Sequence, residues 1–435
     1  MNNHALKIGI AGLGTIGVGV VRVLQKHGGK LAEKAGRPVE LVGVCDLDRT
    51  RDRGVELSSY EWFDDAIAMA QAGSIDTFVE LIGGEGGIAL KCVQAALKAG
   101  KHVVTANKAM LAKHGSELAE LAEENNVFLY YEAAVAGGIP IVKTLRESLA
   151  GNDITRVYGI MNGTCNYILT KMEDEGKDFA QVLKDAQDLG YAEADPTADI
   201  GGFDTAHKLA LLTALAFGTR VDFDSVYVEG IERISSADLE AARNLGYRIK
   251  LLGVAVKTDT GIEQRVHPTM VPLHSAIAEV HDVFNAVMID GDFIDELMLM
   301  GRGAGEGPTA SSVVSDLVDL ARGGKQPVFG VPVKELRPYQ AARMRTHEGG
   351  YYVRLTVPDQ PGIMAAITSR MAEHGISLES IVQRAPENGE DGAVSVSVIL
   401  ITHETTELEM RGALDAIFAD GTASEKPQMI RIERA

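Results

Sequence analysis

The stretch Lys7-Ile-Gly-Ile-Ala-Gly-Leu-Gly-Thr-Ile-Gly17 decides how this chain begins to fold. Its first five residues form an apolar run typical of a buried strand, and helical periodicity follows over 15–27. A Gly-x-Gly-x-x-Gly spacing between strand and helix is the pattern of a dinucleotide-binding turn, in which the diphosphate lies at the helix N-terminus. The first glycine permits the turn, the second lets the backbone approach the diphosphate, and the third allows close packing. We therefore expect cofactor contacts from Gly12, Leu13, Gly14, Thr15, Ile16 and Gly17.

The end of the next predicted strand, 39–45, bears on the choice of cofactor. Asp46 follows it, further beyond Gly17 than the roughly 20 residues typical of this fold, and we attribute the excess to an insertion at 28–38. An acid here binds the ribose hydroxyl of NAD, but it could instead cap a turn. Nearby arginines could pair with the 2′-phosphate of NADP: Arg49, Arg51 and Arg53. The choice between NAD and NADP stays open.

Strand and helix patterns alternate up to about residue 131, which predicts a doubly wound parallel sheet of the Rossmann type. Strands are expected over 39–45, 77–81, 102–104 and 127–131, and helices over 87–99 and 109–124. Ligands bind at the carboxyl ends of parallel strands. We therefore expect the loop with Gly83 and Gly84 to lie near the nicotinamide, and Thr105 and Lys108, which follow the next strand, to contact the cofactor.

Together with the rest of the chain, this pattern predicts an α/β protein of three domains. The dinucleotide-binding domain is expected over 1–138 plus 303–322, and an α+β substrate and oligomerisation domain over 139–302. Residues 323–350, rich in Gly, Pro and charge, are expected to be a linker. The order βαββαβ over 351–435 predicts a ferredoxin-like domain.

Composition limits the partners. The formal net charge of -19 argues against nucleic acid or an anionic membrane surface as a partner. No apolar run approaches the roughly 20 residues that a membrane-spanning helix needs. Three scattered cysteines (Cys45, Cys92 and Cys165) suit a reducing compartment, so we expect a cytoplasmic protein.

Four further segments carry polar residues in apolar surroundings: Val104-Thr-Ala-Asn-Lys108, Glu132-Ala-Ala-Val-Ala-Gly-Gly-Ile-Pro140, Met161-Asn-Gly-Thr-Cys-Asn-Tyr-Ile-Leu169, and Gly190-Tyr-Ala-Glu-Ala-Asp-Pro-Thr197 continuing to Lys208. From the first strand to about Ala321 the chain resembles homoserine dehydrogenase. That family reversibly reduces aspartate 4-semialdehyde to homoserine with NAD(P)H. The part with Asp359-Gln-Pro-Gly362 resembles an ACT domain, a module that commonly binds amino-acid effectors, threonine being the usual inhibitor in this pathway. As no kinase-like segment precedes residue 1, we expect the monofunctional form.

The resemblance implies that Lys208 is the proton donor and Lys108 a second active-site lysine. Oxidising an alcohol removes a hydroxyl proton while hydride leaves, and a lysine of lowered pKa can take that proton. Two ammonium groups in one pocket would lower at least one pKa. The alternative is that Asp204 and Lys208, four apart on a helix, form an ordinary pair worth about 0.2–0.5 kcal/mol.

The substrate's ammonium group needs acidic partners. By resemblance Glu193 and Asp204 are substrate-binding acids, and Asp199 is a possible third. Thr164 and Tyr191 are further candidates for the substrate's polar groups.

Two other segments have assignments that stay open. By resemblance, the Glu132 carboxylate and the carbonyls of Val135, Gly137 and Ile139 hold sodium, and the alternative is a buried hinge. Gly303 and Gly305 are expected to contact the cofactor where the chain returns to the first domain; the alternative is a plain helix start.

The apolar stripes near 162–175 and 179–189 predict a subunit interface, and hence a homodimer or homotetramer. The sequence leaves two rival functions open: another amino-acid dehydrogenase on a related fold, and a catalytically silent metabolite sensor.

Overall fold

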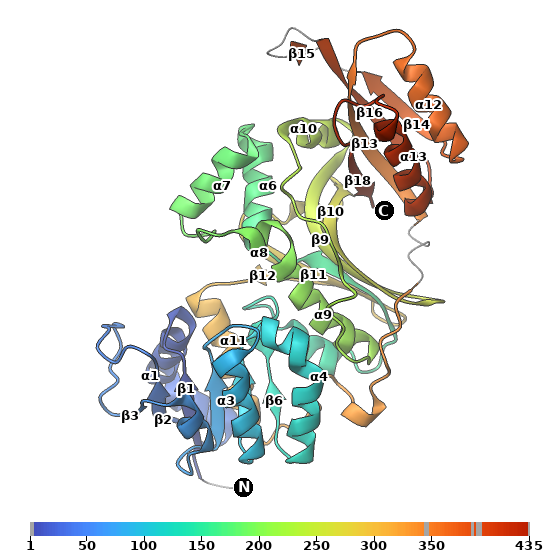
Figure 1. Cartoon of the computed structure of the whole chain (residues 1–435). Coiled ribbons are helices and arrows are strands. Elements are labelled where there is room, and N and C mark those ends of the chain that lie inside the picture. The colour runs from blue at the N-terminus through green and yellow to red at the C-terminus, as the bar shows by residue number, and fades with distance from the viewer. Residues whose placement is uncertain (1–3, 343–347, 384–386, 389–393, 434–435) are drawn as a thin grey trace.

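The computed structural model describes residues 4–342, 348–383, 387–388 and 394–433. Within them the chain forms a six-stranded and a twelve-stranded β-sheet with helices packed against both (Figure 1). The six-stranded sheet lies at one end of an elongated molecule, and the C-terminal helices lie at the other. No helix in this part of the chain is both long and apolar enough to cross a membrane.

The six-stranded sheet is parallel and has the order β3-β2-β1-β4-β5-β6. Its strands are β1 (Leu6–Ala11), β2 (Val39–Cys45), β3 (Glu61–Phe63), β4 (Thr77–Glu80), β5 (His102–Thr105) and β6 (Leu129–Tyr130). One face packs on α1 (Thr15–Ala35) and α11 (Glu306–Ala321), the other on α2 (Ala66–Gln71), α3 (Gly87–Lys98) and α4 (Lys108–Glu124). The predicted doubly wound sheet is confirmed. Its order reverses between β1 and β4, where such sheets bind ligands.

The helix predicted over 15–27 is longer than expected, because residues 28–35 of the expected insertion are helical. Helix α1 continues through Gly28 and Gly29 to Ala35 and ends at Gly36, which has the left-handed φ of 76° typical of a helix C-terminus. Two helical glycines cost roughly 1 kcal/mol each relative to alanine. Leu24, Leu31 and Ala35 continue the face that packs on the sheet, and this burial offsets that cost. The short elements β3 and α2 were missed because neither is long enough to show a clear period.

The twelve-stranded sheet has the main order β12-β11-β7-β9-β10-β18-β13-β16-β14. Its first five strands are β7 (Ile154–Ile160), β9 (Tyr247–Thr258), β10 (Gly261–Pro272), β11 (Phe284–Gly291) and β12 (Asp295–Arg302). Helices α6 (Gly163–Glu175), α7 (Phe179–Asp188), α8 (Thr197–Ile200), α9 (Phe203–Phe217) and α10 (Ser236–Asn244) belong to the same α+β part. The buried helix α9 packs on β7, β9 and β10, which places Lys208 next to the sheet.

The C-terminal part has the predicted ferredoxin-like order. It consists of β13 (Glu348–Pro358), α12 (Ile363–Glu373), β14 (Leu378–Gln383), β16 (Val394–Thr402), α13 (Glu407–Ala419) and β18 (Gln428–Ile432). Its sheet joins the preceding one because Thr269 and Met270 of β10 pair in parallel with Arg431 and Ile432 of β18. A short strand, β15 (Glu387–Asn388), pairs with β16.

Two contacts fix this C-terminal part to α10. The Tyr352 hydroxyl donates to the Asp238 carboxylate at 2.9 Å, and Arg354 donates to the same carboxylate at 2.7 Å. The segment expected to be a linker also packs on the core, through Val328 and Phe329, which are 3% and 1% exposed. The described part of that segment is therefore attached to the domains along its length.

Candidate active site

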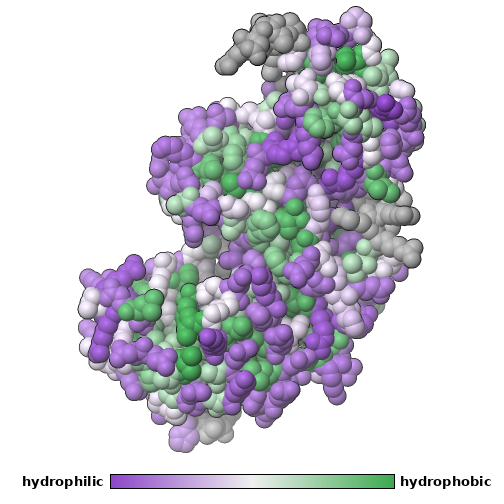
Figure 2. Space-filling view, in the orientation of Figure 1, coloured by the Kyte–Doolittle hydropathy of each residue, from purple (hydrophilic) through white to green (hydrophobic). Residues whose placement is uncertain are grey.

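A pocket of about 640 Å³ lies between the carboxyl ends of the first sheet and the α+β part. Figure 2 shows the surface indented between these two parts of the molecule. Residues predicted to bind cofactor, substrate or sodium or to transfer a proton meet here: Ile16, Lys108, Gly137, Thr164, Tyr191, Glu193, Asp199, Asp204, Lys208, Gly303 and Gly305. The fold thus gathers residues that lie as far apart in the sequence as Ile16 and Gly305, which are 289 positions apart.

Two lysines share one carboxylate in this pocket. The Lys208 Nζ lies 2.6 Å from Asp204 Oδ2, and the Lys108 Nζ lies 3.0 Å from Asp204 Oδ1. Lys208 is buried and also donates to the Met161 carbonyl at 2.6 Å, whereas the Lys108 side chain is 38% exposed. Asp204 therefore bridges one buried and one accessible ammonium group.

The pKa values of the three groups shift apart. Burial lowers the pKa of Lys208, and the Lys108 charge lowers it further, against the opposing effect of Asp204. The Asp204 carboxylate is the main cause of a raised pKa at Lys108. Burial alone would raise the pKa of Asp204, but the two ammonium groups outweigh it and lower that pKa. Lys208 is therefore the lysine that loses its proton more easily.

Asn162 completes this cluster, and its role was missed. It lies just before α6, where its side-chain oxygen accepts from the Cys165 N–H at 2.8 Å. Its Nδ2 donates to Asp199 at 2.7 Å and to Asp204 at 2.9 Å. An Asn ahead of a helical period is an N-cap signal, but the sequence does not show that the free amide reaches two acids.

The segment 190–193 forms the outer wall. The Thr164 hydroxyl donates to the Tyr191 carbonyl at 2.7 Å and so ties this segment to α6. Glu193 is exposed on the pocket, while burial raises the pKa of Asp199. The Tyr191 ring packs edge-on against Tyr167, with ring centroids 5.1 Å apart.

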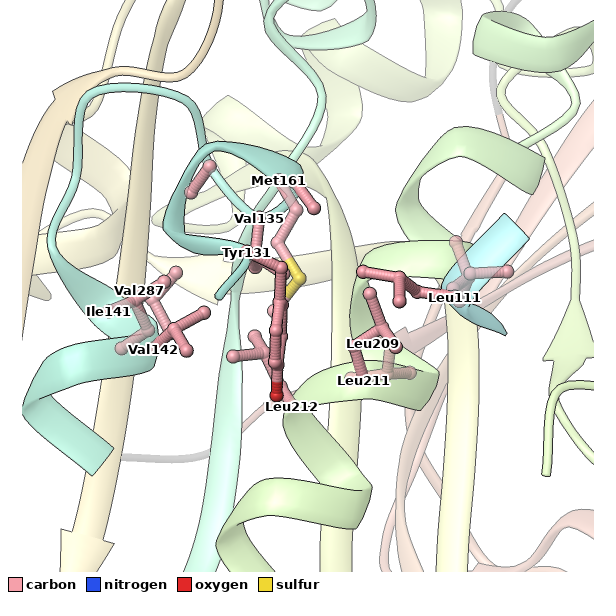
Figure 3. Close-up of a cluster of buried hydrophobic side chains, with 14 of the residues drawn as sticks. Leu111, Tyr131, Val135, Ile141, Val142, Met161, Leu209, Leu211, Leu212 and Val287 are labelled. Atoms are coloured by element: carbon pink, nitrogen blue, oxygen red, sulfur yellow. The ribbon is translucent and has the colours of Figure 1, made fainter. Parts of the chain in front are cut away.

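The apolar floor behind the pocket is one continuous core. Figure 3 shows Leu111 of α4, Leu209 and Leu212 of α9 and Val287 of β11 gathered around Tyr131. Leu209 follows Lys208 directly. Because interiors packed in this way are rigid, the backbone at Lys208 is held in place.

The glycine turn has the geometry that its spacing predicts. Gly12 has a φ of 95°, and a Cβ there would overlap the Leu81 backbone. A Cβ on Gly17 would overlap the Gly12 carbonyl oxygen, whereas one on Gly14 would meet nothing within 4 Å. Helix α1 has no side-chain cap at its N-terminus, so the N–H groups there are available to an anion. The residues present fit a dinucleotide diphosphate.

Asp46 accepts a hydrogen bond from the Leu13 N–H at 2.6 Å and lies 3.3 Å from the buried Arg53 guanidinium. Arg53 also donates to the carbonyls of Leu13 and Asp48. Arg49 is exposed, with its guanidinium carbon 5.7 Å from the centre of the Trp62 ring. Arg53 thus holds the turn, and Arg49 is left on the surface next to it.

Glu80 shapes the second glycine loop and was also missed. It is fully buried, and its Oε1 accepts from the N–H groups of Ile82 and Gly83 at 2.8 and 3.0 Å. The Thr105 hydroxyl donates to its other oxygen at 2.5 Å. Thr105, expected to contact the cofactor, has a fully buried side chain that also holds this loop. Asn107 donates to the Gly84 carbonyl at 2.7 Å.

The Glu132 carboxylate is buried at the turn expected to hold a cation. It accepts from the N–H groups of Val142 and Lys143 at 2.9 and 2.8 Å. Burial raises its pKa and that of Asp316, which accepts from the Glu132 N–H. Gly137 has a positive φ of 50°, and its carbonyl accepts from the Ser312 hydroxyl. Within the described residues, no three His, Cys, Asp or Glu side chains are grouped as metal ligands, so a cation here would depend on carbonyl oxygens.

The loop at 303–305 lies against this turn. A Cβ on Gly303 would overlap the Asn285 amide, and Gly305 has a φ of 113° just before α11. Helix α11 begins at Glu306, directly after Gly305. Both glycines line the pocket, so this helix start is also a wall of the site.

Comparison with known proteins agrees with this geometry. Three family models match: the homoserine dehydrogenase NAD binding domain over 12–132, homoserine dehydrogenase over 140–318, and the ACT domain over 351–419. The homoserine dehydrogenase of Pseudomonas aeruginosa is 43% identical, covering 99% of both chains, and that of Neisseria gonorrhoeae is 41% identical, covering 98% of both. A crystal structure of the Thiobacillus denitrificans enzyme is 40% identical, covers 99% of this chain and 98% of its own, and has a TM-score of 0.92.

A dinucleotide-binding sheet that faces a pocket with a buried lysine defines an NAD(P)-dependent oxidoreductase. The relatives and family models make the class specific. The chain belongs to the homoserine dehydrogenase family and carries a C-terminal ACT domain.

Proposed function

We propose that the enzyme reversibly reduces L-aspartate 4-semialdehyde to L-homoserine in this pocket, and that Lys208 transfers the proton. The observation that carries this proposal is the buried Lys208, held 2.6 Å from Asp204 in a pocket that the glycine-loop residues Ile16 and Gly303 also line. The nicotinamide of a bound NAD(P) supplies or accepts the hydride. In the reductive direction the Lys208 Nζ gives its proton to the carbonyl oxygen as the alcohol forms, and in oxidation it takes that proton back.

Lys108 and the acids position the substrate in this proposal. The accessible ammonium group of Lys108 polarises the carbonyl oxygen. Both oxygens of Asp204 are already engaged by lysines, so Asp204 mainly orients the two amines. Glu193 and Asp199 are then the acids that bind the substrate's ammonium group, and Thr164 and Tyr191 border that end of the pocket.

The function is tested by initial rates with the purified full chain. We expect homoserine, but not aspartate, to reduce NAD or NADP, as monitored by absorbance of the reduced nicotinamide. Oxidation of aspartate would indicate a related amino-acid dehydrogenase. Folded protein without turnover, with sodium and both cofactors present, would indicate a metabolite sensor.

We infer that the enzyme accepts NADPH through Arg49, because Arg53 already pairs with Asp46 and Arg49 is exposed beside it. A hyperthermophilic archaeal homoserine dehydrogenase solved in complex with NADPH is 26% identical and has a TM-score of 0.62, covering 73% of this chain and 97% of its own. Losing one charge-assisted hydrogen bond, about 1.5 kcal/mol, should raise the KM for NADPH roughly tenfold in Arg49→Ala. The KM for NADH should not change. Equal changes for both cofactors would contradict this role.

We also propose that a sodium ion lies beside Glu132, held by its carboxylate and the carbonyls of Val135, Gly137 and Ile139. The burial of Glu132 beside Asp316, which raises the pKa of both carboxyl groups, supports a cation at this turn. Replacing sodium by tetramethylammonium at constant ionic strength should lower the rate severalfold, and a chelator of divalent ions should have no effect. Equal rates in the two salts would exclude the site.

We propose a division of labour along the chain. Residues 1–138 and 303–322 bind the cofactor, and residues 139–302 bind the substrate and form the interface of a homodimer or homotetramer. Residues 323–350 link this part to residues 351–435, which bind an amino-acid effector. Threonine is the first effector to test. The attachment of the ACT sheet to β10 and α10 supports signalling to the catalytic part. We place the enzyme in the cytoplasm. Unchanged rates with millimolar threonine would exclude that effector.

A further inference from the structure

A buried lysine outside the pocket contacts a segment that forms one of the pocket's walls. Lys250 lies on β9 and is 1% exposed. Its Nζ donates to the Asn166 side-chain oxygen at 3.0 Å and to the Val280 carbonyl at 2.6 Å. In the described part of the chain, no carboxylate lies within ion-pair distance of it. Its charge is therefore held by neutral oxygens.

Asn166, on α6, links Lys250 to the segment 280–284 through hydrogen bonds. Its Nδ2 lies 3.1, 3.0 and 3.2 Å from the carbonyl oxygens of Val280, Asp282 and Phe284. Asp282 has a φ of 53°, which is uncommon for a residue other than glycine. One amide and one ammonium group thus bind the carbonyl oxygens of a turn with an unusual backbone.

This turn is part of the substrate pocket. Val283 and Asn285 both line it. The Val283 carbonyl would lie only 2.8 Å from a Cβ on Gly163, so the turn packs directly on the first turn of α6. That first turn also carries Thr164. A shift of the turn would therefore change the space beside the proposed substrate-binding residues.

We propose that Lys250 is a positioning residue for substrate binding: through Asn166 it fixes the segment 280–285, which forms a wall of the pocket. It touches neither cofactor nor reacting atoms. A buried ammonium group costs free energy that a methionine of similar length would avoid. The three carbonyl oxygens converging on Asn166 explain why a strong donor lies here instead.

Burial gives this contact a pH dependence, since it lowers the pKa of Lys250 to about 8. The charged groups around it are Arg248 on its own strand, Glu173 and Asp174 on α6, and Glu279 before the turn. Arg248 opposes the lysine's charge and the three acids favour it. As pH rises through about 8, the ammonium group becomes a neutral amine, which is a weaker donor. Its hydrogen bonds to Asn166 and to the Val280 carbonyl therefore weaken.

The test compares Lys250→Met and Lys250→Arg with the parent enzyme in steady-state kinetics at pH 7 and pH 9. We expect the methionine variant to raise the KM for homoserine about tenfold, with kcat changed less than twofold, because a displaced wall weakens substrate binding. The KM for the dinucleotide should stay the same. The parent's KM for homoserine should rise between pH 7 and 9, and that rise should be absent in the methionine variant. Arginine, which keeps its charge, should restore part of the binding at both pH values.

Thr269→Val is the matched control. Thr269 is the cross-strand neighbour of Lys250 and is equally buried, but its side chain does not reach the turn. The valine variant loses the hydrogen bond between the Thr269 hydroxyl and His267. It should lower the Tm without changing the KM for homoserine. If Lys250→Met behaves as Thr269→Val does, Lys250 has only a structural role and the proposal fails. If the methionine variant does not fold, Lys250→Gln takes its place, and a KM equal to the parent's would overturn the proposal equally.

Discussion

Replacing Lys208 by methionine is expected to lower kcat for homoserine oxidation by about 10²–10⁴-fold, the range for losing a positioned acid or base. Methionine keeps the length and fits the apolar surroundings of a side chain that is 7% exposed. Asp204, Lys108 and Asn162 remain, so substrate and cofactor binding should persist. The KM for homoserine should therefore change much less than kcat.

The pH profile separates proton transfer from simple damage to the site. Lys208 must be neutral to accept a proton, and its pKa is lowered from an ordinary value of 10.5 mainly by burial. Oxidation in the parent should therefore accelerate as pH rises through this lowered pKa, and reduction should slow. Lys208→Met should lose both trends. Lys184→Met is the control, since Lys184 pairs with Asp188 across one helical turn but is 73% exposed. A parent-like profile in Lys208→Met would remove Lys208 from the mechanism.

The sequence predicts the parts of the site that are local. The glycine turn, β1 and the helix after it lie within one short stretch, and each glycine has a separate steric reason visible in the spacing. Asp204 and Lys208 are neighbours because residues four apart on a helix share a face. The alternative of an ordinary surface pair fails only because α9 is buried, and its apolar flank indicates that burial.

Residue spacing alone does not predict contacts between distant segments, although the family resemblance implies that both lysines belong to the active site. Lys108 follows β5 and Asp204 lies on α9, and their 3.0 Å approach depends on how two domains pack. Glu80 looks like the end of an apolar strand, and only the structure shows it accepting from Ile82, Gly83 and Thr105. The joining of two sheets through β10 and β18 depends on a two-residue pairing that carries no sequence period.

Asp204→Asn is expected to have the second largest effect, because it leaves two ammonium groups facing each other without a carboxylate. The pKa of Lys108 should fall, since Asp204 is the main cause of its increase, and that of Lys208 should fall further. Neither amine would then keep its orientation toward the substrate. We expect kcat to fall about 10²-fold, measured at saturating homoserine and dinucleotide.

Stability should respond as well. Breaking a buried pair costs about 3–5 kcal/mol, and because this pocket opens to solvent we expect about 1–3 kcal/mol by denaturant unfolding. The folded-state pKa of Asp204 is lowered, so its contribution is complete above its unfolded pKa of about 4 and is lost progressively as pH falls from there through the lower folded-state pKa. The variant should therefore lose stability at pH 7 and resemble the parent more closely near pH 3.

Asp188→Asn, which removes the exposed partner of Lys184, is the control and should change neither rate nor stability measurably. A full rate in Asp204→Asn would mean that the two lysines do not need a shared carboxylate, and the proposed arrangement of the site would be wrong.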